Sequence, residues 1–277
     1  MAVNVYLSGN PVHDKVLAAF HEGINGDKAM RPVTAYEPSD IAVVFGVYKK
    51  AVPASFHRGA VIDQQRKRGG RGIVLETGYV NRGDDEDSHY AAGWGSINGW
   101  ADFRNIGMPG DRWDKLGVKI RPWRHRGDYI LLIGQVPWDA SVQHIDMERW
   151  LTETAEEIAR ETSRPIIYRP HPKAGVPKHI TGCRTSGRSL LGDLEASRAV
   201  VTFNSTTAIE AVIDGIPTFV LGDGSMAKQV ANWSLDRMGR PDTPDREQWA
   251  FDLAYSQWTP AEMRSGETWR HLTAVGR

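Results

Sequence analysis

Short apolar runs alternate with helical patterns along the first half of the chain. Residues 3–7 form an apolar run that ends in a Ser-Gly-Asn-Pro turn, and apolar residues then recur at helical spacing over 16–23. The runs 41–47 and 72–75 are too apolar for half-exposed strands and predict buried parallel strands, with a helix over 61–68 between them. This half is therefore predicted to repeat strands joined by helices or loops.

The second half begins a similar series. Residues 129–133 predict a buried strand, and residues 147–160 have the spacing of an amphipathic helix. The remaining elements are predicted as strands over 165–168, 198–203 and 218–221 and a helix over 207–213. Strands that alternate with helices in this way predict the α/β class with parallel sheets.

The region between the two series is long and irregular, and it carries an acidic patch over 84–87 and several tryptophans among glycines. Loops of this length inside a compact domain are usually functional or disordered, and the tryptophans argue against disorder. Two series of ordinary domain size predict two α/β domains, over 1–127 and 128–245. Residues 246–277 are predicted to be a helical segment that packs back across the domains.

Composition excludes several classes of protein. The chain has 277 residues, of which 40% are hydrophobic, and 34 basic residues balance 34 acidic ones. That composition excludes a disordered tail and a collagen. The sequence contains no run of roughly eighteen apolar residues, the length that a membrane-spanning helix needs, and the first residues lack the features of a secretory signal. We therefore expect a cytoplasmic protein without a membrane partner. The only cysteine, Cys183, cannot form an internal disulfide.

Parallel sheets bind ligands at the carboxyl ends of their strands, so polar residues that follow a predicted strand are candidate site residues. Arg169, His171 and Lys173 follow the strand over 165–168 on a proline-framed loop. Two cations and a histidine on a stiff loop suit a phosphate group. The structural alternative is a proline-rich surface loop with a solvated lysine. Gln135 follows the strand over 129–133, where it would meet a ligand or form part of a simple turn.

A second group of polar residues follows the strand over 198–203 and opens a helix. Ser205, Thr206 and Thr207 would offer hydroxyl and backbone N–H groups to an anion such as a diphosphate. Thr207 and Glu210 also have the spacing of a capping box, which needs no ligand. The two interpretations are compatible, because a capping Thr207 would leave Ser205 and Thr206 for the ligand.

Glu76 comes directly after the buried strand over 72–75 and is followed by Thr77 and Gly78. A partly desolvated carboxylate at a strand end is suited to act as a general base for a hydroxyl. An ion pair with Arg82 or Arg71 is the structural alternative.

Several catalytic and binding motifs are absent from the sequence. It has no Gly-x-Gly-x-x-Gly after a strand, no Walker loop, no Gly-x-Ser-x-Gly elbow and no His-Glu-x-x-His zinc helix. The missing motifs exclude these four kinds of site. We expect neither a metal nor a cofactor, because fixed cations and a helix dipole can stabilise a phosphate without a metal ion.

The second-half motifs resemble those of a known family. Residues 169–173 (RPHPK), 200–211 (VVTFNSTTAIEA) and 215–220 (GIPTFV) resemble, in this order, the nucleotide-sugar domain of GT-B glycosyltransferases. The nearest resemblance is to bacterial capsule-type Kdo transferases and sialyltransferases. It implies a GT-B fold, with two Rossmann-like domains facing a central cleft, domain 1–127 binding the acceptor and domain 128–245 binding the nucleotide sugar.

The resemblance also implies roles for individual residues. His171 and Lys173 would contact the phosphate or nucleotide of the donor, and Ser205 and Thr206 its phosphate. The families carry an acidic pair before a glycine in the N-terminal domain, but here the second acidic position is Thr77. The base is therefore Glu76 or a residue elsewhere, such as Asp102 or Asp63.

A looser resemblance concerns the acceptor. The Glu-x-Gly-Tyr sequence that starts at Glu76, with the aromatic and glycine-rich stretch 90–103, is similar to small phage-encoded glycosyltransferases. Those proteins transfer sugars to hydroxylated bases of phage DNA, which implies double-stranded DNA with modified bases, such as hydroxymethylcytosine, as a partner. A phage-encoded protein would work in the host cytoplasm.

Charge distribution favours the same acceptor. Residues 1–127 carry 18 lysines and arginines against 14 acidic residues, a net charge of +4, and residues 128–277 carry −4. Clustered cations beside tryptophans suit a phosphate backbone and an extruded base. The candidate acceptor-binding residues are Arg66, Lys67, Arg71, Arg82, Trp94 and Trp100. The alternative is a solvated helix face.

The predicted activity is displacement at the anomeric carbon of a nucleotide sugar, such as a UDP-sugar, which is a substrate rather than a cofactor. Glu76 accepts the proton of the acceptor hydroxyl, while Arg169, His171, Lys173 and the helix start at 205–207 stabilise the departing phosphate. Glu210 would hold hydroxyls of the donor. Three alternatives stay open: transfer to a polysaccharide or other glycan, a sugar-nucleotide epimerase, and a non-catalytic sugar-binding module.

Overall fold

The computed structural model describes residues 1–50, 52–175 and 178–274. The chain divides into two compact units. Unit 1 comprises Met1–Gly117 and Ala250–Arg277, and unit 2 comprises Val118–Trp249. These units differ from the predicted domains at two places, since 118–127 belongs to unit 2 and the last segment of the chain belongs to unit 1.

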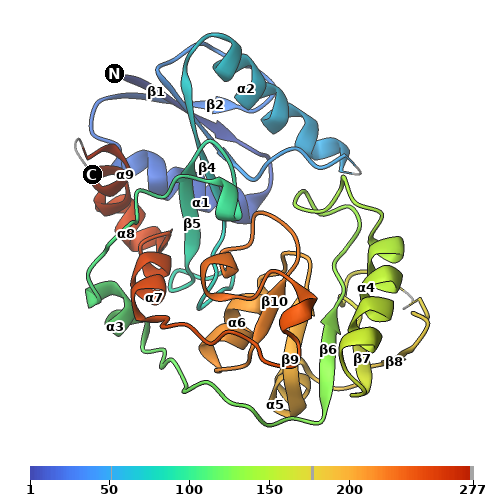
Figure 1. The fold of residues 1–277 in the computed structure, drawn as a ribbon. Coiled ribbons are helices and arrows are strands. Elements are labelled where there is room, and N and C mark those ends of the chain that lie inside the picture. Colours follow the sequence, from blue (N-terminus) through green and yellow to red (C-terminus); the bar gives the residue numbers. More distant parts are fainter. Residues whose placement is uncertain (51, 176–177, 275–277) are drawn as a thin grey trace. The chain divides into compact units, whose positions relative to one another are not determined.

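Unit 1 is built on a mixed sheet with the strand order β11-β5-β4-β3-β1-β2 (Figure 1). Strands β2, β1, β3 and β4 are parallel to one another, whereas β5 is antiparallel to β4 and β11 is antiparallel to β5. The predicted parallel sheet is therefore confirmed for four strands, and two antiparallel strands that the sequence does not predict extend it at one edge. The bounds are β1 Ala2–Leu7, β2 Asp27–Pro32, β3 Ile41–Phe45, β4 Arg71–Thr77, β5 Tyr90–Trp94 and β11 Gln257–Trp258.

Helices cover both faces of this sheet. Helix α1 (Pro11–Gly23) begins after Asn10, whose side chain accepts hydrogen bonds from the backbone N–H groups of Val12 and His13. With α8 (Pro260–Arg264) and α9 (Glu267–Thr273), α1 packs on one face through a shared apolar core. Helix α2 (Phe56–Lys67) packs on the other face. The remaining elements of unit 1 are α3 (Asp111–Leu116), η1 (Pro53–Ser55) and η2 (Asn98–Trp100).

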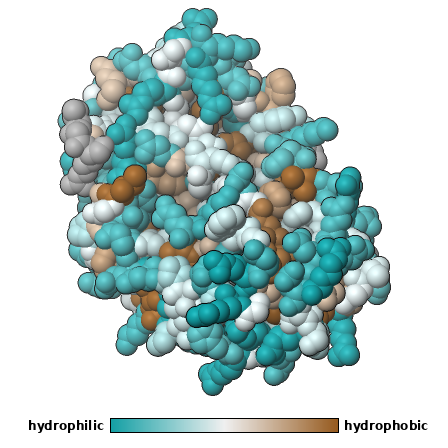
Figure 2. All heavy atoms as spheres, viewed as in Figure 1, coloured by the Kyte–Doolittle hydropathy of each residue, from teal (hydrophilic) through white to brown (hydrophobic). Residues whose placement is uncertain are grey.

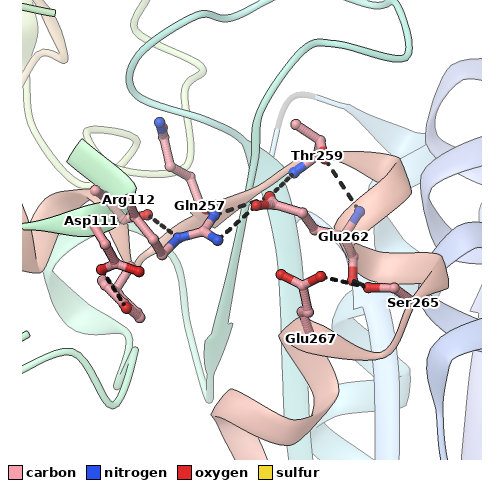
Figure 3. A network of polar contacts seen from close by, with 9 residues as sticks. Asp111, Arg112, Gln257, Thr259, Glu262, Ser265 and Glu267 are labelled. Carbon is pink, nitrogen blue, oxygen red and sulfur yellow. Dashed lines mark hydrogen bonds and ion pairs between the residues drawn. The ribbon is translucent and has the colours of Figure 1, made fainter. Parts of the chain in front are cut away.

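The last segment of the chain is an integral part of unit 1. The side-chain oxygen of Gln257 accepts hydrogen bonds from the backbone N–H groups of Tyr79 and Val80, at 2.7 and 2.9 Å. Arg112, which is 7% exposed, forms a two-pronged ion pair with Glu262 at 2.7 and 3.0 Å (Figure 3). These contacts join positions that lie far apart in the sequence, so unit 1 is complete only with its C-terminal segment.

Unit 2 is built on a parallel sheet with the strand order β10-β9-β6-β7-β8. Alternate residues of β6 point into separate cores, with Ile130 and Leu132 on one face and Leu131 and Ile133 on the other. This is the doubly wound arrangement that the sequence predicts. The strands are β6 Tyr129–Ile133, β7 Ile166–Arg169, β8 Cys183–Thr185, β9 Ser197–Thr202 and β10 Thr218–Val220.

The helices of unit 2 include one that links it to unit 1 along the chain. The bounds are α4 Met147–Glu161, α5 Leu190–Ala196, α6 Thr207–Ile213, η3 Lys228–Val230 and η4 Leu235–Arg237. Helix α7 (Glu247–Ala254) contains the point at which the chain passes back to unit 1.

Polar side chains dominate the face shown in Figure 2, where hydrophobic residues form small, separate areas rather than one broad patch. Within the described ranges, no helix has the length and apolar character that crossing a bilayer requires.

Candidate functional site

The strand order of unit 2 creates a topological switch point. From β6 the chain moves to β7 and β8 on one side, and it then crosses to β9 and β10 on the other side. Helices that follow β6 and β9 leave in opposite directions, which opens a crevice at the carboxyl ends of these two strands. Gln135 follows β6 and Ser205 follows β9, so both predicted donor-binding residues lie at this crevice.

A pair of amide side chains joins the two strand ends at the switch point. Nε2 of Gln135 donates to Oδ1 of Asn204 at 2.8 Å, and the backbone N–H of Asn204 donates to Oε1 of Gln135 at 3.0 Å. Nδ2 of Asn204 also donates to the backbone carbonyls of Ser141 and Asp223, at 3.2 and 2.9 Å. Asn204 is 5% exposed. Asn204 therefore joins the loops that follow β6, β9 and β10, which explains why an asparagine precedes Ser205. The sequence alone does not predict this role.

His171 follows β7 on the loop that the sequence singled out. Its Nδ1 accepts a hydrogen bond from the backbone N–H of Lys173 at 3.1 Å. Burial and the nearby Lys173 ammonium lower the pKa of His171 below its ordinary value, against the opposing effect of Asp139. The ring is therefore neutral at pH 7, and because Nδ1 accepts, its proton lies on Nε2. His171 can donate a hydrogen bond from Nε2.

Arg169 makes a structural ion pair. Its Nη1 lies 2.7 Å from Oδ2 of Asp193, a fully buried carboxylate, and donates to the carbonyl of Arg188 at 2.7 Å. Ser186 also donates to Asp193. The guanidinium thus has a partner within unit 2, and a role for Arg169 in donor binding remains a prediction. Lys173, in contrast, is exposed.

The start of α6 corrects one expectation. The helix begins at Thr207 as predicted, but its N-cap is Thr206, whose side chain makes no capping hydrogen bond. Thr207 is the first helical residue, and its backbone N–H donates to Oγ of Ser205 at 3.3 Å. The predicted capping box of Thr207 and Glu210 is therefore wrong, because Thr207 lies inside the helix rather than at its cap. Ser205, Thr206 and Thr207 are half-buried beside Asn204.

Unit 1 has its own switch point, between β1 and β3, since the chain moves from β1 to β2 on one side and then to β3 and β4 on the other. Glu76 lies at the carboxyl end of β4, where it is half-buried, and its Oε1 accepts the backbone N–H of Thr77 at 3.1 Å. Gly46 follows β3 with φ +72°. A Cβ at Gly46 would lie 2.7 Å from Nη1 of Arg58 and 3.4 Å from Oε2 of Glu76. The guanidinium and the carboxylate therefore converge over Gly46.

Two further titratable groups lie at this edge of unit 1, His13 near Arg58 and Tyr79 near Glu76. The ring of His13 stacks on Phe45, with 4.0 Å between centroids and 9° between planes. Burial, and then Arg58, lower the pKa of His13, so the imidazole is neutral at pH 7. Tyr79 is fully buried, and burial followed by the charge of Glu76 raises the pKa of its hydroxyl. The charge of Glu76 thus acts on the guanidinium of Arg58 and on the neutral phenol of Tyr79.

Most of the predicted acceptor-binding residues lie at the opposite end of the sheet. Arg71 is the first residue of β4, about 17 Å along the strand from Glu76. Its guanidinium lies over the Trp94 ring, 3.5 Å from the centroid. Arg66, near the end of α2 with Lys67, donates to the carbonyl of Gly95 at 2.5 Å. The structure therefore does not bring Arg66, Lys67 and Arg71 together with Glu76, and it rules out an ion pair between Arg71 and Glu76.

Trp94 is part of the core. It is 6% exposed, Arg71 covers one face of its ring, and its Nε1 donates to the carbonyl of Leu272 at 3.0 Å. It is therefore not available to stack on an extruded base as it stands. Trp100 follows β5 in η2 and is 42% exposed, and Arg82 is exposed in the loop that leaves the Glu76 end of β4.

The two alternative bases also lie elsewhere. Asp102 forms a backbone bridge with Trp94 and an ion pair with Arg104 at 3.1 Å, which places it at the amino end of β4. Asp63 is exposed in the middle of α2. Of the three acidic candidates, Glu76 alone lies at the carboxyl end of a parallel strand.

Metal-binding side chains, the single cysteine and a cavity of unit 1 add nothing to the site around Glu76. Among residues 1–50, 52–175 and 178–274, no three His, Cys, Asp or Glu side chains gather as a metal site. Burial raises the pKa of the Cys183 thiol to about 11, which leaves it unreactive at neutral pH. An open cavity of about 320 Å³ is lined by Asp111, Arg112, Lys115, Tyr255, Trp258, Glu267, Arg270, His271 and Ala274, and Glu76 does not line it.

Comparison with known proteins gives matches among solved structures only. No protein-family model matches the chain, and no curated protein matches its sequence. The structure of the KpsC beta Kdo 2,7 transferase of Thermosulfurimonas dismutans has a TM-score of 0.58 and 15% identity, and the match covers 95% of this chain and 97% of that one. The KpsC beta Kdo 2,4 transferase of the same organism has a TM-score of 0.60 and 16% identity, with 92% and 90% covered.

A third match is weaker. The structure of the Methanocaldococcus jannaschii UDP-GlcNAc 2-epimerase, solved with UDP-GlcNAc and UDP, has 12% identity, and the match covers both chains fully. Its TM-score of 0.36 is too low to show a common fold. At these identities a likeness shows the fold alone. The predicted resemblance to capsule-type Kdo transferases is thus confirmed for the fold, and the chain has the GT-B fold of sugar transferases.

Proposed function

We propose that the protein is a glycosyltransferase that moves a sugar from a nucleotide-sugar donor to an acceptor hydroxyl. The observation that carries this proposal is the convergence of Gln135, His171 and Ser205 at the carboxyl ends of the unit 2 strands, around the switch point. The fold likeness to two sugar transferases over more than nine-tenths of the chain supports it.

The donor binds in unit 2, with its diphosphate or phosphate beside β7 and β9. Nε2 of the neutral His171 donates to a phosphate oxygen, and Lys173 supplies a positive charge for the leaving group. The hydroxyls of Ser205 and Thr206 donate to the same anion. Oγ of Ser205 is held at the start of α6, where it accepts the backbone N–H of Thr207 and lies 3.3 Å from its hydroxyl, so its proton turns from Thr207 to the anion when the donor binds. Fixed donors of this kind stabilise charge that develops on the leaving phosphate.

The acceptor hydroxyl binds in unit 1 against Glu76. Its oxygen attacks the anomeric carbon of the donor sugar, the bond from that carbon to the phosphate oxygen breaks, and Glu76 accepts the hydroxyl proton.

For the acceptor, we retain a hydroxymethylated base of double-stranded DNA as the hypothesis to be tested against a glycan. The net charge of +4 over residues 1–127 does not carry over to unit 1, because Lys119, Arg121, Arg124 and Arg126 lie in unit 2. Unit 1 has 17 basic and 17 acidic residues, so only the looser resemblance supports this acceptor. Arg66, Lys67 and Arg71 could contact only a part of that polymer about 17 Å or more from the reacting hydroxyl.

The donor site gives a direct test. Replacing Ser205 and Thr206 together by Ala is expected to weaken nucleotide binding about 100-fold or more, because two hydrogen bonds to a charged group are lost and each is worth about 1.5 kcal/mol or more. Calorimetric titration with UDP, GDP and CMP measures the affinity. The matched control replaces Thr162 and Ser163, at the amino end of β7, by Ala and should bind as the wild type does.

Unchanged nucleotide affinity in the Ser205 and Thr206 variant would contradict the donor site. Incubation of the wild-type protein with a nucleotide sugar and no acceptor separates an epimerase from a transferase. Conversion of the donor sugar into its epimer would favour the epimerase, whereas we expect the donor sugar to keep its configuration.

A further inference from the structure

We propose that Arg58 is a positioning residue for Glu76, which keeps this carboxylate ionised and turned toward the acceptor hydroxyl. The proposal rests on the function proposed above and assigns a role to a residue that neither the motifs nor the fold likeness identify. It concerns only side chains of unit 1.

The first step is the convergence of the two charged groups over Gly46. One point, the place of a missing Cβ, lies 2.7 Å from Nη1 of Arg58 and 3.4 Å from Oε2 of Glu76, so these atoms are no more than about 6 Å apart. Any side chain at Gly46 would fill this space. The glycine therefore allows the guanidinium to approach the carboxylate.

The second step is that Arg58 is anchored. Its Nη1 donates to the carbonyl of Phe45 at 2.8 Å, and the residue lies in the first turns of α2. Ile62, one turn further along α2, packs against Gly72 of β4. Because side chains alternate along a strand, Glu76 lies on the same face of β4 as Gly72, which is the face that α2 covers. The helix thus holds Arg58 beside Glu76.

Other charged and titratable groups also lie at this edge of unit 1. Helix α1 contributes His13 and Asp14, the loop after β3 contributes Lys49, and the loop after β4 contributes Tyr79 and Asp84. His13 and Tyr79 are neutral at pH 7. The carboxylate of Asp14 accepts hydrogen bonds from Ser8 and Gly9 at 2.7 to 3.0 Å, which engages it on the α1 side. Arg58 is the anchored cation on the α2 side.

These observations give Arg58 a specific task. A general base must be ionised to accept a proton, and partial burial works against ionisation of a carboxylate. A nearby opposite charge favours the ionised form and so offsets that effect. Arginine suits the task because it stays protonated even where burial lowers its pKa, as it does here. Arg58 therefore sets the lower end of the pH range in which Glu76 can work.

The test is the pH dependence of sugar transfer by the full chain. In Arg58→Met, the acidic limb of the kcat/KM profile is expected to move to higher pH by about one unit, with the KM for the nucleotide sugar unchanged. Arg58→Lys keeps the charge, so its acidic limb should stay close to that of the wild type. Arg68→Met, at the other end of α2, removes an exposed cation and should leave the profile where it is.

A second variant covers the case in which Arg58→Met does not fold. Gly46→Ala keeps every charge but places a Cβ 2.7 Å from Nη1 of Arg58, so the guanidinium must move away. It should shift the acidic limb in the same direction. An acidic limb that stays in place in the folded variants would overturn the role of Arg58. Full transfer by Glu76→Gln would instead contradict Glu76 as the base, so the two failures are distinguishable.

Discussion

Glu76→Gln is expected to lower kcat for sugar transfer by about 10²- to 10⁴-fold, the usual contribution of a positioned general base. The amide keeps the shape of the side chain and can still accept the N–H of Thr77, but it cannot take the proton of the acceptor hydroxyl. Nucleotide affinity should stay the same, because the donor-binding residues lie in unit 2. Initial rates at saturating donor, together with calorimetric titration of UDP, GDP or CMP, check both parts.

The control for this variant is Glu37→Gln. Glu37 lies in unit 1 with its side chain 52% exposed and pairs with Arg31 at 2.8 Å on the surface. Such pairs contribute little to stability, so transfer should proceed at the wild-type rate. Equal losses in the two variants would show that removing a negative charge from unit 1 is harmful in itself, which would contradict a specific role for Glu76.

Glu262→Ala is expected to destabilise unit 1 by about 3–5 kcal/mol, because it leaves the guanidinium of Arg112 buried without its carboxylate. Arg112 lies within the core, with its guanidinium carbon 3.8 Å from the centroid of the Trp258 ring. Glu262 also completes the capping box of α8 with Thr259 (Figure 3). Urea unfolding followed by fluorescence measures the loss.

Two comparisons sharpen this prediction. Glu153→Ala breaks an exposed ion pair with Arg149 at the same 2.7 Å distance and should cost no more than about 1 kcal/mol. Replacing Arg112 and Glu262 together by Met should cost less than Glu262→Ala alone, because no buried charge is left unpaired. If Glu262→Ala costs as little as Glu153→Ala, the pair does not hold the C-terminal segment in unit 1.

The same pair makes stability depend on pH. Burial acts to raise the pKa of Glu262, but the hydrogen bonds and charge of Arg112 outweigh it, and the net effect is a pKa below the ordinary 4.5. A carboxylate with a lowered pKa in the folded state contributes stability above its unfolded pKa and loses it as the pH falls. Stability should therefore decline below about pH 4.5, and less so in the double Met variant.

Sequence patterns predicted the elements with strong apolar periodicity. Helix α6 has its predicted bounds, and β1, β3, β6, β9 and α4 agree to within one or two residues. The missed strands carry weak patterns. Strand β2 is half exposed and polar, β5 contains a glycine and two alanines, and β11 has two residues. Their pairing depends on contacts between distant segments, which local periodicity does not record.

The sequence predicts only those site residues whose place follows from the strand order. Residues that directly follow a parallel strand, such as Glu76, Gln135 and His171, were found because topology alone brings strand ends to one edge. Arg58 was missed because only packing of α2 on β4 brings it to Glu76. The expected ion pair between Arg71 and Glu76 does not form, because the two residues are close in sequence but lie at opposite ends of β4.

The most direct test of the proposed function is product formation by the wild-type protein. Panels of UDP-, GDP- and CMP-sugars are incubated with hydroxymethylated DNA, unmodified DNA and glycans, and mass spectrometry reads the acceptor. The account predicts that one acceptor gains the mass of one sugar with loss of the nucleotide, and that Glu76→Gln does not form this product. Equal product with Glu76→Gln, or donor turnover with every acceptor left unmodified, would contradict it.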